Sequence, residues 1–269
     1  MSTLDIALRN MLVAEKVCQV DRTGRKYIES PYGNQVTATV QTIAGTYAVS
    51  AWTTTNDTLT VTDEFIYAEH IYDFENSLSA FDVFASRTDE QNYGIVYGID
   101  KWVVNNLCED GTGTYTTPVG GFTTAANVNK IFADLGAKVM GYADTYKGLY
   151  IIIENSDTAG IALAQASSGF SYADMALRNG FMTSHMGIDI YVVRDGTFVD
   201  DTLGTTTVTN DGHRVFGVKG VTTYAAPIDI KNEELMVTTK TGKEVRTYGY
   251  CGFHAWVAKR ALTVDITIA

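Results

Sequence analysis

The stretch "TVTDEFIYAEHIYDFE", residues 60–75, places acidic side chains and a histidine among aromatic and β-branched residues. The enrichment in Thr, Val, Ile, Phe and Tyr predicts a strand. On a strand, Asp63, Glu69 and Asp73 share one face, whereas Glu64 and His70 share the other. Asp63 and Glu69 would then lie ~20 Å apart at ~3.3 Å per residue, too far to share a metal ion or a proton. The stretch therefore predicts a long structural strand rather than a catalytic or metal centre.

The segment that follows, from about residue 75 to residue 107, has helical periodicity. Val96, Ile99, Val103 and Leu107 recur at spacings of three and four residues. A continuous helix of this length would span roughly 50 Å, which suits a rod-like spine better than a compact enzyme. The polar segment "SRTDEQN" interrupts the apolar stripe. The pattern leaves open whether the helix is broken near residues 85–94.

The segment before the strand predicts a hairpin. Residues 36–42 and 47–53 alternate as strands do, and no charged residue occurs from 33 to 55. Solvent-exposed strand edges usually carry charges that discourage pairing with other chains. The uncharged hairpin is therefore expected to lie on another surface, and an internal hairpin of a sheet remains the alternative. Residues 21–34 read as a polar link, and Asn56–Thr58 as a turn.

The remaining chain alternates helical and strand patterns and then becomes β-rich. At the N-terminus, an apolar face predicts an amphipathic helix; its members are Leu4, Leu8, Met11 and Leu12. Residues 128–135 predict a helix that stops at Gly136, and residues 149–153 a buried strand followed by a short capped helix. Strand patterns continue at 187–193 and from residue 214 to the end, with a hairpin turn at 241–243.

The composition excludes several classes of protein. A net charge of −11 disfavours nucleic-acid binding, which needs a basic surface. No apolar run approaches the ~20 residues of a membrane-spanning helix. Cys18, Cys108 and Cys251 form no metal-binding spacing and leave one thiol unpaired in any disulfide scheme, so we expect free thiols in a reducing compartment.

Three local patterns invite a chemical interpretation, and each falls short. Cys251 and His254 are a single pair where a structural zinc site needs four ligands. The segment 184–189 contains Ser, His and Asp but lacks the context of a catalytic triad. Residues 111–116 lack the third glycine of a dinucleotide-binding loop. The sequence thus predicts a protein that is not an enzyme, with no catalytic, cofactor-binding or metal-binding residues.

Seven segments in chain order carry a resemblance to a known family. They are "DEFIYAEHIYDFENSLSAFD" (63–82), "NYGIVYGIDKWVVNNL" (92–107), "NVNKIFADLGAKV" (127–139), "GLYIIIENSDTAGIA" (148–162), "ALRNGFMTSHMGIDIYVVRDG" (176–196), "VFGVKGVTTYAAPIDI" (215–230) and "TYGYCGFHAWVAKRALTVDI" (247–266). The first two resemble the long strand and spine helix of the major capsid proteins of tailed bacteriophages, the Hong Kong 97 type of coat protein. The others resemble that family's axial domain and closing strands.

This resemblance implies an α+β coat subunit with four parts. Residues 1–32 would form an N-terminal arm, 33–58 an extended loop, 59–112 with 222–269 a peripheral domain and closing strands, and 113–221 an axial domain. The residues expected to contact other subunits are Val40, Ile43, Tyr47, Val49, Trp52, Glu69 and Asp73. The extended loop contains no lysine, so the lysine–asparagine cross-link of some family members is not expected.

The resemblance also implies partners and a location. Subunits would self-assemble through hexamers and pentamers into an icosahedral phage head, in the host cytoplasm, that encloses double-stranded DNA without sequence-specific binding and without a membrane. A separate scaffolding protein and a portal are expected, and a decoration protein is allowed for. The alternative with the same fold is an encapsulin-type nanocompartment shell, because "GRKYIESPYG" (24–33) resembles a segment near the encapsulin N-terminus. A weaker alternative is an enzyme or carbohydrate-binding β-rich protein that uses the Tyr-rich C-terminal sheet.

Overall fold

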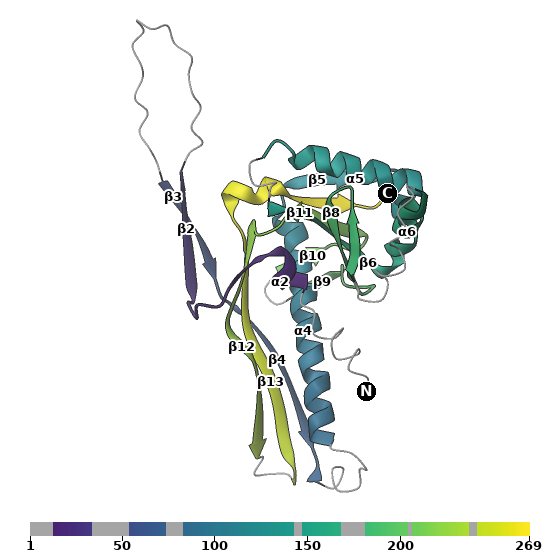
Figure 1. The fold of residues 1–269 in the computed structure, drawn as a ribbon. Helices are drawn as coiled ribbons and strands as arrows, with labels where there is room; N and C mark the ends of the chain where they lie inside the picture. The colour runs from purple at the N-terminus through teal and green to yellow at the C-terminus, as the bar shows by residue number, and fades with distance from the viewer. Residues whose placement is uncertain are drawn as a thin grey trace, which may run out of the picture.

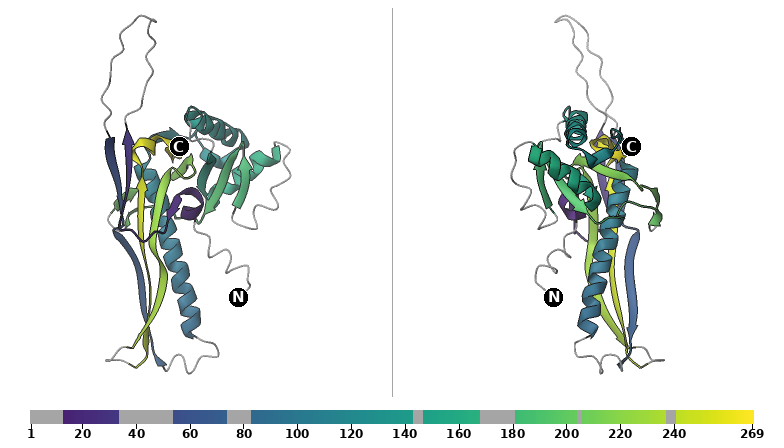
Figure 2. Two further views of the ribbon diagram at one scale, coloured as in Figure 1. Left: turned by 60° about the vertical axis from the view of Figure 1, so that its left-hand side comes forward. Right: turned by 90° about the vertical axis from the view of Figure 1, so that its right-hand side faces the viewer.

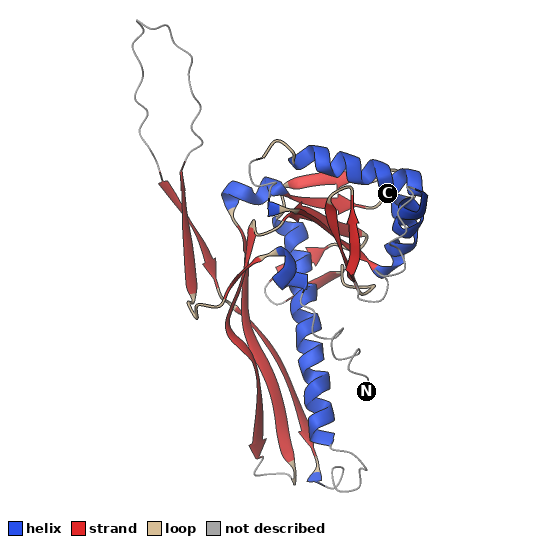
Figure 3. Cartoon of the chain, in the orientation of Figure 1, coloured by secondary structure: helices blue, strands red, loops and turns tan. Residues whose placement is uncertain are grey.

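The computed structural model describes residues 13–33, 54–73, 83–142, 147–167, 181–203, 206–236 and 241–269. Within these ranges the chain builds a long four-stranded sheet, a six-stranded sheet and a separate two-stranded ribbon (Figure 1). One long helix runs beside the four-stranded sheet and continues under the six-stranded sheet (Figure 3). The mixture of helices and sheets confirms the predicted α+β class.

The four-stranded sheet has the order β1–β12–β13–β4. Its strands are β1 (Gln19–Asp21), β12 (Thr222–Met236), β13 (Lys243–Ala255) and β4 (Asp63–Ile71). β12, β13 and β4 are antiparallel neighbours, whereas the short β1 runs parallel to β12. Alternate residues of β13, such as Val245, Thr247 and Cys251, are buried toward the helix. The predicted long strand is thus confirmed as β4.

The helix α4 (Val83–Asp110) lies along one face of this sheet, as the two turned views show (Figure 2). It is continuous from Val83 to Asp110, so the helix is not broken at residues 85–94, a point that the sequence pattern left open. The polar segment "SRTDEQN" includes Gln91, which is buried. Its Oε1 accepts a hydrogen bond from Thr247 Oγ1 at 2.8 Å. A polar residue on the buried stripe is therefore paired with the sheet rather than marking a bend. The predicted start near residue 75 lies outside the described residues.

The six-stranded sheet has the order β5–β14–β11–β6–β8–β7. Its strands are β5 (Gly113–Thr116), β14 (Thr263–Thr267), β11 (His213–Val218), β6 (Leu149–Glu154), β8 (Ile188–Val193) and β7 (Phe181–His185). Both faces are covered. Ile151 and Phe216 pack toward α5 and α6, whereas Tyr150, Ile152 and Val215 join the core around α4. A strand buried on both faces reads as a continuous apolar run, which is why residues 149–153 were recognisable.

The helices α5 (Ala125–Val139) and α6 (Thr158–Ser167) cover the outer face of that sheet. The prediction that Gly136 ends the first helix is wrong, because α5 continues to Val139. Nothing lies within 4 Å of a Cβ at Gly136, so this glycine needs no special conformation. The short helices η1 (Gly121–Thr123) and η3 (Asn155–Asp157) precede α5 and α6, and Glu154 with Asp157 forms a capping box at η3. None of the described helices is long and apolar enough to cross a membrane.

The two-stranded ribbon pairs β2 (Tyr27–Gly33) with β3 (Thr54–Thr60) and projects away from the sheets (Figure 1). Two predictions are corrected here. Part of the supposed polar link, residues 21–34, is strand β2, and the supposed turn at Asn56–Thr58 lies within strand β3. Polar residues occupy both strands because most of β3 is solvent-exposed. Predicted strands 36–42 and 47–53 lie outside the described residues.

Three smaller elements complete the chain. α2 (Val13–Val17) packs beside α4, β9 (Asp200–Leu203) pairs with β10 (Thr206–Thr209), and η4 (Val257–Leu262) precedes β14. The apolar positions of the predicted N-terminal helix lie outside the described residues. The predicted domain boundaries stay predictions. Strand β14 lies within residues 222–269, which the sequence assigned to the peripheral domain and closing strands, but it pairs with β11 and β5 of the six-stranded sheet.

Candidate assembly surface

One carboxylate of the ribbon β2–β3 forms hydrogen bonds with the body of the molecule. Asp57, in β3, accepts a hydrogen bond from Val257 N at 2.7 Å through Oδ2, while its Oδ1 lies 2.7 Å from His254 Nε2. Partial burial acts to raise the pKa of Asp57, but the hydrogen bonds from Val257 and His254 lower it overall. The His254 ring in turn packs edge-on against Trp256. Asp57 thus joins β3 to both β13 and η4.

An apolar contact lies beside the hydrogen bonds of Asp57 with Val257 and His254, which together form the Asp57 clamp. Leu59 is almost completely buried, and its side chain approaches Gly252 of β13 so closely that a Cβ there would lie 3.1 Å from Leu59 Cδ2. On the other side, a cavity of about 240 Å³ separates the ribbon from the body; Ser30, Pro31, Asp57 and Trp256 are among the residues that line it. The ribbon is therefore attached through a narrow line of contacts rather than a broad interface.

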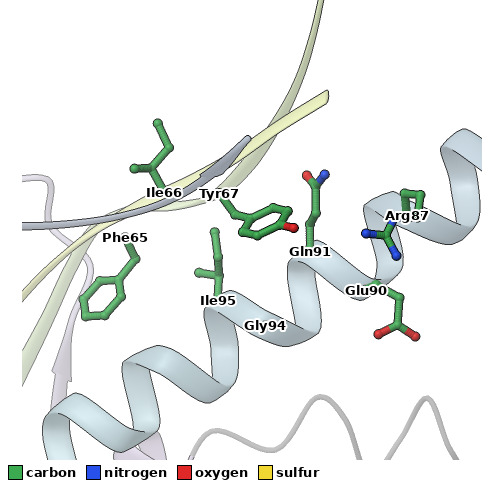
Figure 4. Close-up of a pocket in the computed structure, with 8 residues that line it drawn as sticks. All are labelled: Phe65, Ile66, Tyr67, Arg87, Glu90, Gln91, Gly94 and Ile95. Atoms are coloured by element: carbon green, nitrogen blue, oxygen red, sulfur yellow. The ribbon is translucent and has the colours of Figure 1, made fainter. Parts of the chain in front are cut away.

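A second feature is a groove between β4 and α4, shown in Figure 4. It has a volume of about 400 Å³ and is lined by Phe65, Ile66, Tyr67, Arg87, Glu90, Gln91, Gly94 and Ile95. Ile66 and Tyr67 are 53% and 48% exposed, which is high for large apolar side chains on a strand. A Cβ at Gly94 would meet nothing within 4 Å, so the helix surface is open at this point.

The groove lies along an unprotected sheet edge. β4 pairs with β13 on one side only, and no other described strand pairs with its outer edge. Its run from Phe65 to Ala68 has no charged residue. The opposite edge of the sheet differs: beyond its pairing with β1, the exposed end of β12 carries Lys231, Glu233 and Glu234. Charges on an edge strand discourage pairing with another chain. β4 carries Asp63, Glu64 and Glu69, so on this strand the uncharged run from Phe65 to Ala68 is the part suited to a partner.

The sequence-predicted contact residues fall into two groups. Glu69 lies in β4 and receives two hydrogen bonds from Arg87 of α4, while Asp73 is exposed just beyond the end of β4. Glu64 accepts a hydrogen bond from Tyr250 on β13, which confirms that Glu64 and Glu69 project to different sides of the sheet. The other predicted contact residues lie outside the described residues; they are Val40, Ile43, Tyr47, Val49 and Trp52.

The described residues do not bring the suspected chemical groups together. His185 Nε2 lies 2.9 Å from Asn129 Oδ1, and Asp189 accepts a hydrogen bond from Lys219 at 2.5 Å, so neither is directed at Ser184. Cys251 contacts the Tyr224 hydroxyl rather than His254. Among the described residues no group of three or more His, Cys, Asp and Glu side chains could hold a metal ion. All three cysteines are free and buried.

The pairing of Asp57 with His254, which are 197 residues apart, is not indicated by the sequence. The same is true of a buried ion cluster in the six-stranded sheet. There Arg214, only 4% exposed, donates to Asp157 Oδ2 at 2.5 Å and lies 3.0 Å from Glu154 Oε2. Glu154 Oε1 accepts hydrogen bonds from the backbone N–H groups of residues 196–198. No local spacing in the sequence indicates either arrangement.

Comparison with solved structures identifies the fold. No protein-family model matches the sequence, and no curated protein matches it. Solved structures do match. A structure of Mycobacterium phage Che8 aligns with a TM-score of 0.74 at 14% identity, over 95% of this chain and 91% of that chain. The capsid structure of cyanophage P-SCSP1u aligns with a TM-score of 0.70 at 12% identity, over 96% and 88% of the two chains.

The capsid of a native GTA particle gives a TM-score of 0.69 at 12% identity, over 95% of this chain and 89% of that chain. The chain has the Hong Kong 97 fold of tailed-phage major capsid proteins. In the terms of this fold, α4 is the spine helix and β4, β12 and β13 form the long sheet that it supports. At these identities the similarity is one of fold, carried over nearly the whole chain.

Proposed function

We propose that the chain is a structural coat subunit that assembles into a closed icosahedral shell. The observation that carries this proposal is the likeness in fold to capsid structures over 95% or more of the chain, such as those of cyanophage P-SCSP1u and of the GTA particle. A projecting ribbon and an unprotected sheet edge on the same subunit support it, because both are features that contacts with other copies would cover.

The finer form of the proposal is a phage head. Hexamers and pentamers of this subunit would enclose double-stranded DNA, and the net charge of −11 suits a container that does not bind its DNA by charge. Assembly would take place in the host cytoplasm, with the finished shell in the virion. A separate scaffolding protein and a portal would be required, and a decoration protein is compatible with the exposed surface.

Contacts between subunits are proposed at two places. The uncharged segment 33–55 continues from the last pair of the ribbon, Gly33 with Thr54. An extended uncharged segment of a neighbouring copy is the partner best suited to the groove, where one wall offers the outer edge of β4, which pairs with no other described strand, and the exposed Tyr67. Glu69 and Asp73 lie on this strand or just beyond it and would contribute to the same contact.

The alternative within the fold is an encapsulin-type nanocompartment, favoured only by the resemblance of residues 24–33. The contents of purified particles separate the two, since a phage head packages DNA and an encapsulin packages a cargo protein. Terminase and portal genes beside the coding sequence would favour the phage head, and a cargo-enzyme gene would favour the encapsulin.

The test of the shared claim is assembly of the purified full chain, followed by negative-stain electron microscopy. Closed shells or rings of subunits are expected. A stable monomer under all assembly conditions would overturn the proposal.

A further inference from the structure

Both edge strands of the six-stranded sheet have one unpaired side among the described strands. β5 pairs only with β14, and β7, at the opposite end of the sheet, pairs only with β8. An edge strand directs every second backbone N–H and C=O group away from its own sheet, where these groups can pair with a strand of another chain. The sheet therefore offers a place for strand pairing at each end.

These two edges lack the residues that usually prevent such pairing. β5 has the sequence GTYT and β7 the sequence FMTSH, and neither contains an acidic residue, a lysine, an arginine or a proline. The four-stranded sheet differs, because its edge strands β1 and β4 both contain acidic residues. Charged residues and proline are common means of blocking an edge strand. The two ends of the six-stranded sheet are thus open to pairing over their whole length.

The loop that follows β5 presents an apolar side chain. Val119 is 90% exposed, and its carbonyl oxygen accepts a hydrogen bond from Asn127 Nδ2 at 3.0 Å. In the same loop, Gly120 N donates to Ala269 O at 3.2 Å. These bonds hold the loop to α5 and to the residue after β14. An apolar side chain on a loop that is already ordered can contact a partner without a large cost in conformational entropy.

The turn that follows β7 also presents an apolar side chain. Met186 is 61% exposed and lies in the two-residue turn between β7 and β8. Its φ of 52° is in the left-handed region, where none of the other described residues except glycines has a positive φ. This conformation costs a non-glycine residue about 1–2 kcal/mol. A strained, exposed methionine points to a role outside the single chain.

We propose that β7 of one copy pairs with β5 of the next copy, so that the six-stranded sheets join around a ring of subunits. The direction of pairing follows from the topology. β8, β6, β14 and β5 run in one direction, whereas β7 and β11 run in the other. A sheet that continues into the next copy with the same face outward therefore places β7 and β5 antiparallel. This inference rests on the proposed shell.

The exposed apolar residues then lie at the two ends of the joint. Antiparallel alignment brings Met186, after the end of β7, to the start of β5 in the next copy, and brings Val119 of that copy to the start of β7. The two surfaces differ, and a contact of this kind forms a ring when its rotation closes. Because the strands have only four and five residues, the pairing adds to other contacts between copies and does not replace them.

The test links the two strands in assembled particles. Thr114 on β5 and Ser184 on β7 are exposed, whereas the three native cysteines are buried. The double variant T114C/S184C is assembled and treated with a short bismaleimide, and the linked chains are separated on a denaturing gel. A ladder of linked chains is expected, because every copy carries both strands. The ladder should be absent in T114C and in S184C alone.

A matched control separates strand pairing from general crowding in the particle. T207C/S184C places one cysteine at the exposed Thr207, on strand β10 of a different sheet, and should give no ladder. Assembled particles in which the two double variants link equally, or in which neither links, would overturn the pairing and leave the shell intact. A chain that never assembles would overturn both the shell and the pairing.

Hydrogen exchange gives a second measurement that needs no substitution. The outward amides of β5 and β7 should exchange roughly tenfold or more slowly in assembled particles than in free subunits, because pairing places them in hydrogen bonds. Mass spectrometry of peptides that cover each strand measures the difference. Equal exchange in the two states at both strands contradicts the pairing.

Discussion

Arg87 on the spine helix binds Glu69 on strand β4 through two parallel hydrogen bonds, from Nε to Oε2 at 2.9 Å and from Nη2 to Oε1 at 2.7 Å. The pair fixes one end of the groove that Ile66, Tyr67 and Gly94 also line. Hydrogen bonding and charge from Glu69 raise the pKa of Arg87. A carboxylate that looked in the sequence like part of a reactive cluster is therefore paired within the chain.

The charge of this pair is expected to matter more for assembly than for folding. The side chains of Arg87 and Glu69 are 42% and 29% exposed, and exposed ion pairs contribute only about 0–1 kcal/mol. E69R should lower the free energy of unfolding by about 1 kcal/mol or less, yet abolish particles because it places two cations beside the groove. The double variant E69R/R87E restores the pair and should recover particles in electron microscopy. Failure of the double variant to do better than E69R would show that the pair itself is irrelevant.

Gly94 tests whether the groove receives another copy. Because a Cβ there meets nothing within 4 Å, G94A should fold normally and gain about 0.5–1 kcal/mol in stability from the better helix former. G94F should also fold, but its ring would fill the groove and block assembly. Thermal unfolding and particle counts measure the two effects separately. Normal particles from G94F would exclude the groove as a contact site.

The Asp57 clamp should be sensitive to acid. Its lowered pKa means that its contribution to stability is present above the ordinary value of 3.8 and is lost as the pH falls below it. D57N should cost about 2 kcal/mol at pH 7 and flatten the fall in stability below about pH 4. Denaturant unfolding at several pH values gives both quantities. An equal acid dependence in D57N and the wild type would rule out the clamp as its source.

Two helical glycines should respond in opposite directions. In α5, G136A should stabilise the chain by about 0.5–1 kcal/mol, since the site has free space and helical geometry. In α6, a Cβ at Gly160 would overlap the carbonyl oxygen of Phe122, and G160A should destabilise by about 3 kcal/mol. Thermal unfolding of the two variants side by side is the measurement, and similar melting temperatures would contradict the packing of α6 against η1.

Much of the fold could be predicted from local patterns. The spacing of Val128, Ile131 and Leu135 and the run from Leu149 to Ile153 reflect burial on one face of a helix and on two faces of a sheet. The ends of helices and strands were harder to predict. Glycine often follows the last residue of a helix, but Gly136 lies within α5, which continues to Val139. Strand β2 was not predicted, because an exposed ribbon has no apolar face and its sequence therefore lacks the alternation of apolar and polar residues that indicates a strand.

The assembly surface was predictable only in outline. The sequence shows that residues 33–55 and Phe65–Ala68 contain no charged residue. It does not show which edge of a sheet stays unpaired, because that depends on the order of the strands in the sheet. Asp57 and His254 are joined by the fold across 197 residues, and Gln91 is polar on a buried stripe because Thr247 lies opposite. Contacts at such separations leave no spacing that a single sequence can reveal.

The most direct test of the central claim is the size of the purified full chain under assembly conditions, measured by light scattering and viewed by negative-stain electron microscopy. Closed shells, or rings of five and six subunits, are expected from the wild-type chain; they should disappear in E69R and return in E69R/R87E. A homogeneous monomer at every concentration and salt condition, with the fold intact, would contradict it.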